Sequence, residues 1–217
     1  MEQRIGRLFG SGAGSDVYEY GDKKVCKLYK RDGGYSNNLD WEYNKLLDAY
    51  DNGLPAPRVY EKIFHEGRSG YIMDRIYGVS YLEIFFNHIG RSLEKGLSYA
   101  DTFNSPIITE NIQKMVTYLY NLHQYKCKLR ISGKTSLTYG CMDNKYLTAA
   151  EKEKIISIID ALSDDDCVCH GDPHPGNFIV NNGTIQMIDW NDCVVSSPLY
   201  DIGYPLFCCK GNKLVLQ

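Results

Sequence analysis

The sequence predicts an α+β protein with a small antiparallel-sheet N-terminal lobe, residues 1–76, and a mainly helical C-terminal lobe, residues 77–217. Short β-prone runs separated by glycine turns fill the first part of the chain. Apolar residues at helical spacing dominate the second part, and an Asn-Gly pair marks a late hairpin. A chain of 217 residues is long enough to bury a core in each of two small lobes.

The elements of the N-terminal lobe follow from turns and alternation. Residues 4–30 are predicted as β-hairpins, because the glycines of residues 10–14 and the Gly21-Asp22 pair supply turns. Residues 25–29 alternate as a half-buried strand should. The remaining predicted elements are a helix over 38–50 and strands over 59–64 and 70–74.

The C-terminal lobe is predicted from two amphipathic patterns and one hairpin. Apolar spacing predicts helices over about 112–126 and over 147–162. Thr148 followed three residues later by Glu151 is the capping-box start of the second helix. Two short strands, 178–180 and 185–188, are joined by Asn182-Gly183.

Composition excludes several classes of partner and location. The formal net charge is −3, and no basic stripe indicates nucleic acid or a membrane surface. No apolar run is long enough to cross a bilayer, and the N-terminus lacks the apolar segment of a signal peptide. The eight cysteines include no CxxC pair, which is typical of reduced thiols. We therefore expect a cytoplasmic protein.

The segment from His170 to Asn177, with Asp189 downstream, carries the main chemical signal. Phosphoryl transfer requires an acid that orients the acceptor hydroxyl and oxygen ligands that hold Mg²⁺ against the phosphates. Asp172 and Asn177, on one loop, can face the same cavity, and Asp189 ends a predicted strand. His170 is expected to brace the loop and not to act as the base.

Upstream of His170 lie a glycine-rich turn and then a lysine and a glutamate that can form an ion pair. This order along the chain is the one that nucleotide binding by a kinase requires. Small residues let backbone N–H groups approach phosphates, here at Gly12, Ala13, Gly14 and Ser15. The spacing is neither that of a P-loop nor GxGxxG, and such a turn alone is usually only a turn. Lys27 on the next strand can reach phosphates, and Glu42 on the following helix can pair with it.

From about Gly10 to Asp201 the chain resembles the aminoglycoside phosphotransferase and choline kinase-like family, a branch of the protein-kinase-like fold. The segments HGDPHPGN and IDW carry this resemblance. It implies an ATP-dependent enzyme, with GTP also possible, that moves the γ-phosphate to a hydroxyl of a small molecule. The resemblance further implies that Asp172 is the catalytic base and that Asn177 and Asp189 bind Mg²⁺. It implies that Lys27 and Glu42 position the nucleotide and that the backbone of Met73, Asp74 and Ile76 binds adenine. Asp201 is expected to support the catalytic loop.

The match also departs from the family. Members that act on antibiotics usually carry several helices after the position of Asp201, where only sixteen residues follow here. The acceptor site is then expected to be small, built from residues 81–108, or completed by another chain. Two alternatives stay open: a kinase-fold enzyme acting on a glycan or protein hydroxyl, and a nucleotide-binding pseudoenzyme. Asp189 is followed by Trp-Asn-Asp, which disfavours a conventional protein kinase. The acceptor's identity and the oligomeric state are not determined by the sequence.

Overall fold

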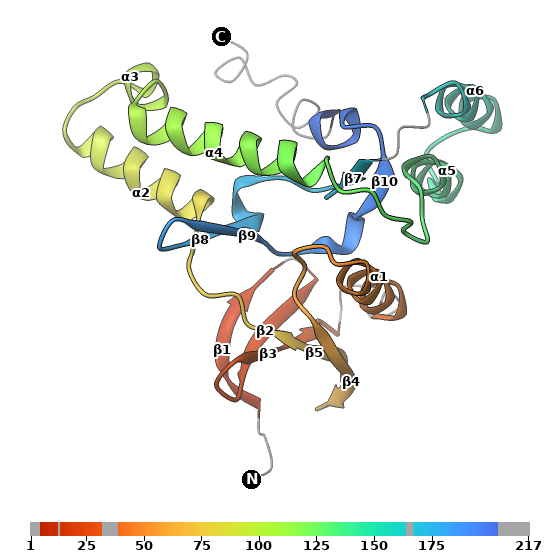
Figure 1. Cartoon of the computed structure of the whole chain (residues 1–217), viewed down its shortest axis with the longest axis horizontal. Helices are drawn as coiled ribbons and strands as arrows, with labels where there is room; N and C mark the ends of the chain where they lie inside the picture. Colours follow the sequence, from red (N-terminus) through yellow and green to blue (C-terminus); the bar gives the residue numbers. More distant parts are fainter. Residues whose placement is uncertain (1–4, 13, 32–38, 164–166, 204–217) are drawn as a thin grey trace. The chain divides into compact units, whose positions relative to one another are not determined.

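The computed structural model describes residues 5–12, 14–31, 39–163 and 167–203, which form two compact units (Figure 1). The first unit contains the described parts of Met1–Gly78 together with Ile179–Asn191. The second contains Val79–Phe178 and the described residues from Asp192 onward. The first break lies close to the predicted boundary at residues 76 and 77. The segment Ile179–Asn191 groups with the N-terminal unit, although the sequence assigned it to the C-terminal lobe.

The first unit is built on a five-stranded antiparallel sheet in the order β1-β2-β3-β5-β4. Its elements are β1 Ile5–Ser11, β2 Ser15–Tyr20, β3 Lys24–Tyr29, α1 Leu39–Asp51, β4 Val59–His65 and β5 Arg68–Asp74. Helix α1 packs against β4 and β5 and buries Leu46 and Ala49. The predicted hairpins, helix and strands of this region are therefore all present.

Strand β3 is more deeply buried than the sequence suggested. Val25, Cys26, Leu28 and Tyr29 are each at most 3 % exposed, so residues on both faces of the strand are buried. The prediction of a half-buried strand was wrong, because both faces of this central strand are covered; on one face Glu42 of helix α1 contacts Lys27 and Tyr29. A central strand places Lys27 in a rigid setting.

A further hairpin, of β8 Phe178–Asn181 and β9 Thr184–Met187, leads into the Ile188-Asp189 segment. Its turn residues Asn182 and Gly183 have φ values of 47° and 81°. Both lie in the left-handed region that an Asn-Gly hairpin turn requires. The predicted hairpin is confirmed.

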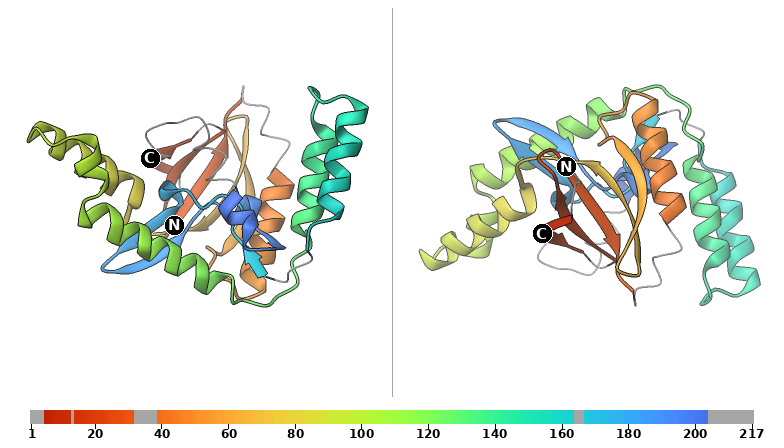
Figure 2. Two further views of the ribbon diagram at one scale, coloured as in Figure 1. Left: turned by 90° about the horizontal axis from the view of Figure 1, so that it is seen from above. Right: turned by 90° about the horizontal axis from the view of Figure 1, so that it is seen from below.

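The second unit is mainly helical, with one short antiparallel strand pair. Its elements are β6 Val79–Ser80, α2 Tyr81–Glu94, α3 Tyr99–Phe103, α4 Pro106–Leu122, α5 Gly133–Asp143, α6 Ala149–Asp160, β7 Cys167–Cys169 and β10 Val194–Ser196. Strands β7 and β10 pair, α2 and α3 pack beside α4, and α5 and α6 form a separate helical pair (Figure 2). None of the described helices is long and apolar enough to cross a membrane.

The helix predictions for this unit were right in part. Helix α6 begins with the predicted capping box, in which Thr148 and Glu151 bond reciprocally. Helix α4 begins earlier than the predicted residue 112, since Pro106 fits the first helical turn, and it ends at Leu122 rather than near residue 126. Helices α2, α3 and α5 are present in the structure but were not among the elements predicted from the sequence.

Candidate active site

A cavity of about 320 Å³ in the first unit collects most of the residues predicted at the nucleotide. Among its lining residues are Gly12, Ser15, Lys27, Met73, Asp74, Ile76 and Asp189. Gly14 and Glu42 are not in the lining, and Ala13 lies outside the described residues. The sheet and the residues after β9 thus bring distant parts of the sequence to one site.

Lys27 is held between two carboxylates. Its Nζ donates to Glu42 Oε2 at 2.9 Å and lies 3.6 Å from Asp189 Oδ1. The side chains of Lys27 and Glu42 are each only 12 % exposed. Burial acts to lower the pKa of Lys27, but the charges of Asp189 and Glu42 outweigh it and raise that pKa above its usual value. The ammonium therefore stays charged, and Glu42 acts on the cavity through Lys27.

The turn between β1 and β2 forms one wall of the cavity. The Gly12 N–H donates to the Ser15 carbonyl at 2.9 Å, and Lys30 Nζ donates to the Gly12 carbonyl at 2.6 Å. Ser11 Oγ donates to Asp16 Oδ1 at 2.7 Å, which ties the two strand ends together. The turn that carries Gly12 and Ser15 into the cavity is therefore held by its own polar groups.

The rest of the cavity is largely apolar, and sequence reasoning missed this part. Besides Met73 and Ile76, the apolar lining includes Phe9, Val17, Val25, Leu46, Pro57, Tyr71, Ile179, Ile188 and Trp190. Val25 could have been found, because it lies two residues before Lys27 and so on the same face of the strand. Ile179 and Ile188 could not, since their approach depends on where the late hairpin packs.

Asp74 and Ile76, which both line the cavity, differ in the polar groups that they leave available to a ligand. The Asp74 carboxylate accepts from the Tyr60 hydroxyl at 2.7 Å and from the Arg58 N–H at 3.3 Å. Within the described part of the chain, the backbone N–H and carbonyl of Ile76 make no hydrogen bond. The backbone of Ile76 is thus available to a ligand, whereas the carboxylate of Asp74 is already engaged.

Asp189 has an unusual backbone conformation. Its φ is +65°, a value that few residues other than glycine adopt. Its Oδ1 accepts from the Asn191 amide, and its side chain is 44 % exposed. Such strain tends to occur at functional sites, and here it presents a carboxylate to the cavity.

In the second unit, the loop after β7 holds Asp172 and Asn177 together. Asn177 Nδ2 donates to the Asp172 backbone oxygen at 2.9 Å and to Asp172 Oδ2 at 3.1 Å. The other carboxylate oxygen of Asp172, Oδ1, is buried and has no hydrogen-bond partner among the described residues. Buried carboxylate oxygens without a partner are uncommon in folded proteins, so this oxygen is an exception among the polar groups of the loop.

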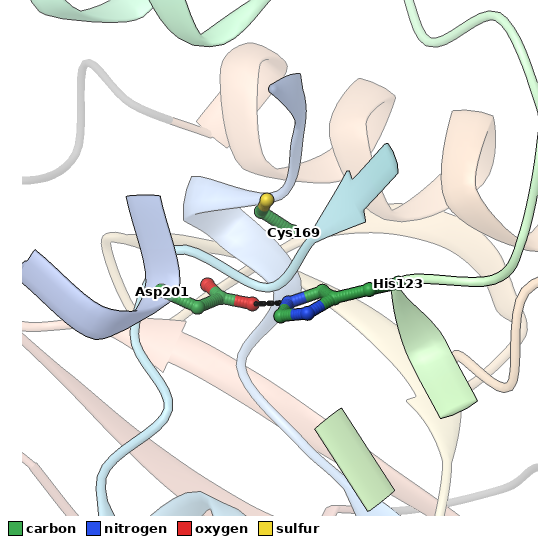
Figure 3. Close-up of side chains that lie close together, drawn as sticks. All are labelled: His123, Cys169 and Asp201. Atoms are coloured by element: carbon green, nitrogen blue, oxygen red, sulfur yellow. Dashed lines mark hydrogen bonds and ion pairs between the residues drawn. The ribbon is translucent and has the colours of Figure 1, made fainter. Parts of the chain in front are cut away.

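Asp201 is hydrogen-bonded to this loop and lies beside His123 and Cys169 (Figure 3). It is 1 % exposed and accepts from the His170 N–H at 3.0 Å and from the Gly171 N–H at 2.7 Å. His123 Nε2 lies 2.9 Å from its Oδ2, and Cys169 is close by. His123 and two backbone N–H groups already engage both oxygens of Asp201, so its carboxylate holds the loop in place.

His170 and Gly171 also serve the shape of the loop. His170 is fully buried, and its Nδ1 accepts from the Asp172 N–H at 3.3 Å, in line with the bracing role expected for it. Gly171 has a φ of +88°, and an added Cβ would lie 2.3 Å from the Asp192 carbonyl oxygen. Only glycine fits at this position without a shift of the backbone.

A family model described as the phosphotransferase enzyme family matches residues 5–211. The chain belongs to this family. No curated protein sequence gives a significant match. Among solved structures, aminoglycoside phosphotransferase APH(3'')-Id from Streptomyces rimosus is 14% identical with a TM-score of 0.54, over 94% of this chain and 79% of that one. A GDP and kanamycin complex of APH(2'')-IIIa is 14% identical with a TM-score of 0.51, over 96% and 74%. These likenesses confirm the predicted two-lobed, kinase-like fold of this phosphotransferase.

Proposed function

We propose that this phosphotransferase binds Mg-ATP at the cavity around Lys27 and transfers the γ-phosphate to a hydroxyl of a small molecule. The composition of the cavity carries the proposal. A buried cation, a carboxylate and a glycine-containing turn line one cavity together with an extended apolar surface. That combination suits a ligand with a polyphosphate at one end and a flat base at the other.

The polar groups around the apolar lining favour adenine. Adenine presents one donor and one acceptor on its exposed edge, which the free carbonyl and N–H of Ile76 can match. Guanine presents two donors on the corresponding edge and would be served best by a carboxylate. The Asp74 carboxylate is already engaged by Tyr60 and Arg58. GTP is therefore the second candidate.

Mg²⁺ fits the oxygen donors that the chain offers. Asp189 supplies a carboxylate to the cavity, and Asn177 uses its amide nitrogen on Asp172, so its carboxamide oxygen remains available. Carboxylate and amide oxygens are the ligands that Mg²⁺ prefers. We propose Asn177 and Asp189 as its ligands; when bound, the ion neutralises phosphate charge.

Asp172 is proposed as the catalytic base. Asn177 holds the carboxylate in place through Oδ2, and the carboxylate would accept a hydrogen bond from the acceptor hydroxyl. The hydroxyl oxygen forms a bond to the γ-phosphorus, the bond from that phosphorus to the leaving nucleoside diphosphate breaks, and the hydroxyl proton passes to the Asp172 carboxylate. Lys27 holds the non-transferred phosphates during this step.

Turnover of acceptors tests the function. We expect ADP release on adding one of a panel of amino sugars and amino alcohols, a starting choice that follows the streptomycin and kanamycin in the names of similar structures. Asp172→Ala should lower turnover by about 10²- to 10⁴-fold while leaving ATP binding intact. Asp143→Ala, at the end of α5, is the matched control.

Each alternative predicts a different result in the same assay. Turnover at the wild-type rate in Asp172→Ala would exclude Asp172 as the base. ADP release only with oligosaccharides or protein substrates would favour the glycan or protein alternative. ATP binding without ADP release for any acceptor would favour a pseudoenzyme.

A further inference from the structure

Glu42 is the meeting point of three donors in the first unit. Its Oε2 accepts from Lys27 Nζ at 2.9 Å, from the Tyr29 hydroxyl at 2.6 Å and lies 3.5 Å from the Tyr71 hydroxyl. Tyr29 is 2 % exposed and Tyr71 is 1 % exposed. The ion pair of Lys27 with Glu42 does not by itself require a hydroxyl from either tyrosine.

Tyr29 is the stronger of the two tyrosine contacts. A hydroxyl-to-carboxylate distance of 2.6 Å is that of a charge-assisted hydrogen bond, whereas 3.5 Å is at the limit of bonding. Burial raises the pKa of Tyr29, and the bond to Glu42 raises it further, so the hydroxyl remains a donor.

The backbone of Tyr29 is fixed independently of its side chain. Its carbonyl oxygen accepts from Arg68 Nε at 2.8 Å. Arg68 also donates to the Leu28 carbonyl at 2.8 Å and to Asp16 Oδ2 at 2.7 Å. The phenol of Tyr29 therefore extends from a strand end whose backbone is held in place, and its hydroxyl can fix the position of Glu42 on helix α1.

The position of Glu42 decides where Lys27 lies. Lys27 has a second acidic neighbour, Asp189, whose Oδ1 is 3.6 Å from its Nζ. If Glu42 were free to move, Lys27 would be drawn toward Asp189. The Lys27 ammonium would then neutralise the Asp189 carboxylate, which is proposed to bind Mg²⁺. It would also move away from the position in which it can bind a phosphate.

We propose that Tyr29 is a positioning residue of the nucleotide site, which fixes Glu42 through its hydroxyl and thereby keeps Lys27 in place for a polyphosphate. This inference rests on the proposed function, because it assigns Lys27 to the phosphates. The proposed role concerns only the polyphosphate end of the ligand. A loss of affinity for this end can therefore be distinguished from a general loss of protein stability, which would affect every ligand.

The test compares two ligands on one substitution. In Tyr29→Phe the ring stays and only the hydroxyl is lost, so we expect the affinity for Mg-ATP to fall about tenfold. The affinity for adenosine, which has no phosphates, should stay within about twofold of that of the wild type. Titration calorimetry with each ligand measures both values.

Two further variants separate positioning from packing. Tyr43→Phe removes a hydroxyl from helix α1, which also carries Glu42; that hydroxyl donates to the Tyr60 carbonyl at 3.2 Å, and its loss should change neither affinity. In a Glu42→Ala background, Tyr29→Phe should cause no further loss of Mg-ATP affinity, because its target is gone. This second comparison separates the loss of the contact with Glu42 from any other effect of removing the Tyr29 hydroxyl.

Equal Mg-ATP affinity in Tyr29→Phe and wild type would overturn the inference. An equal loss for ATP and adenosine would also overturn it, since packing alone explains such a loss. A wild-type protein that binds neither ATP nor GTP would instead contradict the proposed function itself, so the two failures are distinguishable.

Discussion

Lys27 shows how neighbouring charges determine what a single side chain can do. Burial of its ammonium alone would favour the neutral amine, but Asp189 and Glu42 reverse that preference and raise its pKa. A group whose pKa is raised on folding keeps its proton at every pH below its ordinary pKa and loses it only above the raised value. Lys27 therefore remains a cation throughout the neutral and mildly alkaline range.

This assignment predicts how nucleotide affinity depends on pH. Between about pH 7.5 and 9.5, Mg-ATP affinity should be flat, because Lys27 does not titrate there. Lys27→Met should weaken Mg-ATP binding at every pH in that range while the small unit stays folded, since the methionine stem packs like that of lysine. Calorimetric titrations at several pH values check both statements.

A decline in wild-type affinity with a midpoint within that pH range would contradict the charge assigned to Lys27. Binding that Lys27→Met leaves unchanged would show that the cation is not at the phosphates. A melting curve of Lys27→Met serves as the control for folding.

At the level of residues, the sequence placed candidate side chains near one another but did not show what holds them. The spacing of Asp172 and Asn177 suggested that they can face the same cavity, and in the structure their side chains are hydrogen-bonded to each other. The bond of Tyr29 to Glu42 was missed, because a tyrosine at an apolar strand position reads as packing. The hydroxyl's partner depends on how α1 lies against the sheet, and no local pattern records that.

At the level of elements, local signals identified those that begin and end with clear chemistry. Asn182-Gly183 and the Thr148–Glu151 capping box were both predicted, since each is a short-range arrangement of backbone and side chain. Helix α5 escaped prediction because its two buried residues, Gly133 and Cys141, leave little apolar periodicity to detect. Its place is set by contacts with α6 and β10.

The capping box gives a prediction for one element. Thr148→Ala removes the hydroxyl that accepts from the Glu151 N–H, so it should lower the free energy of unfolding by about 1 kcal/mol. Ser157→Ala, on the exposed side of the same helix, is the control and should have little effect. Urea unfolding of both variants measures the difference.

Equal unfolding free energies for Thr148→Ala and wild type would mean that the start of α6 contributes nothing to the stability of its unit. Since Thr148 is far in sequence from Lys27, ATP affinity provides a second check and should not change.

For the whole molecule, family membership and fold were predictable because the decisive segments are short and contiguous. HGDPHPGN and IDW each lie within one stretch of chain, and the family model matches residues 5–211. The sequence placed Ile179–Asn191 with the helical lobe, whereas the structure groups it with the N-terminal unit. The unit with which this hairpin packs depends on contacts between residues far apart in the sequence, and hydrophobic periodicity does not encode such contacts.

The central claim is that the cavity holding Lys27 and Asp189 binds a magnesium–nucleotide complex. Titration calorimetry with ATP, with and without Mg²⁺, on wild type, Asp189→Asn and the control Asp22→Asn tests it most directly. We predict that Mg²⁺ tightens ATP binding by at least about tenfold in wild type and Asp22→Asn, and that Asp189→Asn loses this dependence. ATP binding that neither Mg²⁺ nor Asp189→Asn alters, or no binding of ATP or GTP at all, would contradict the claim.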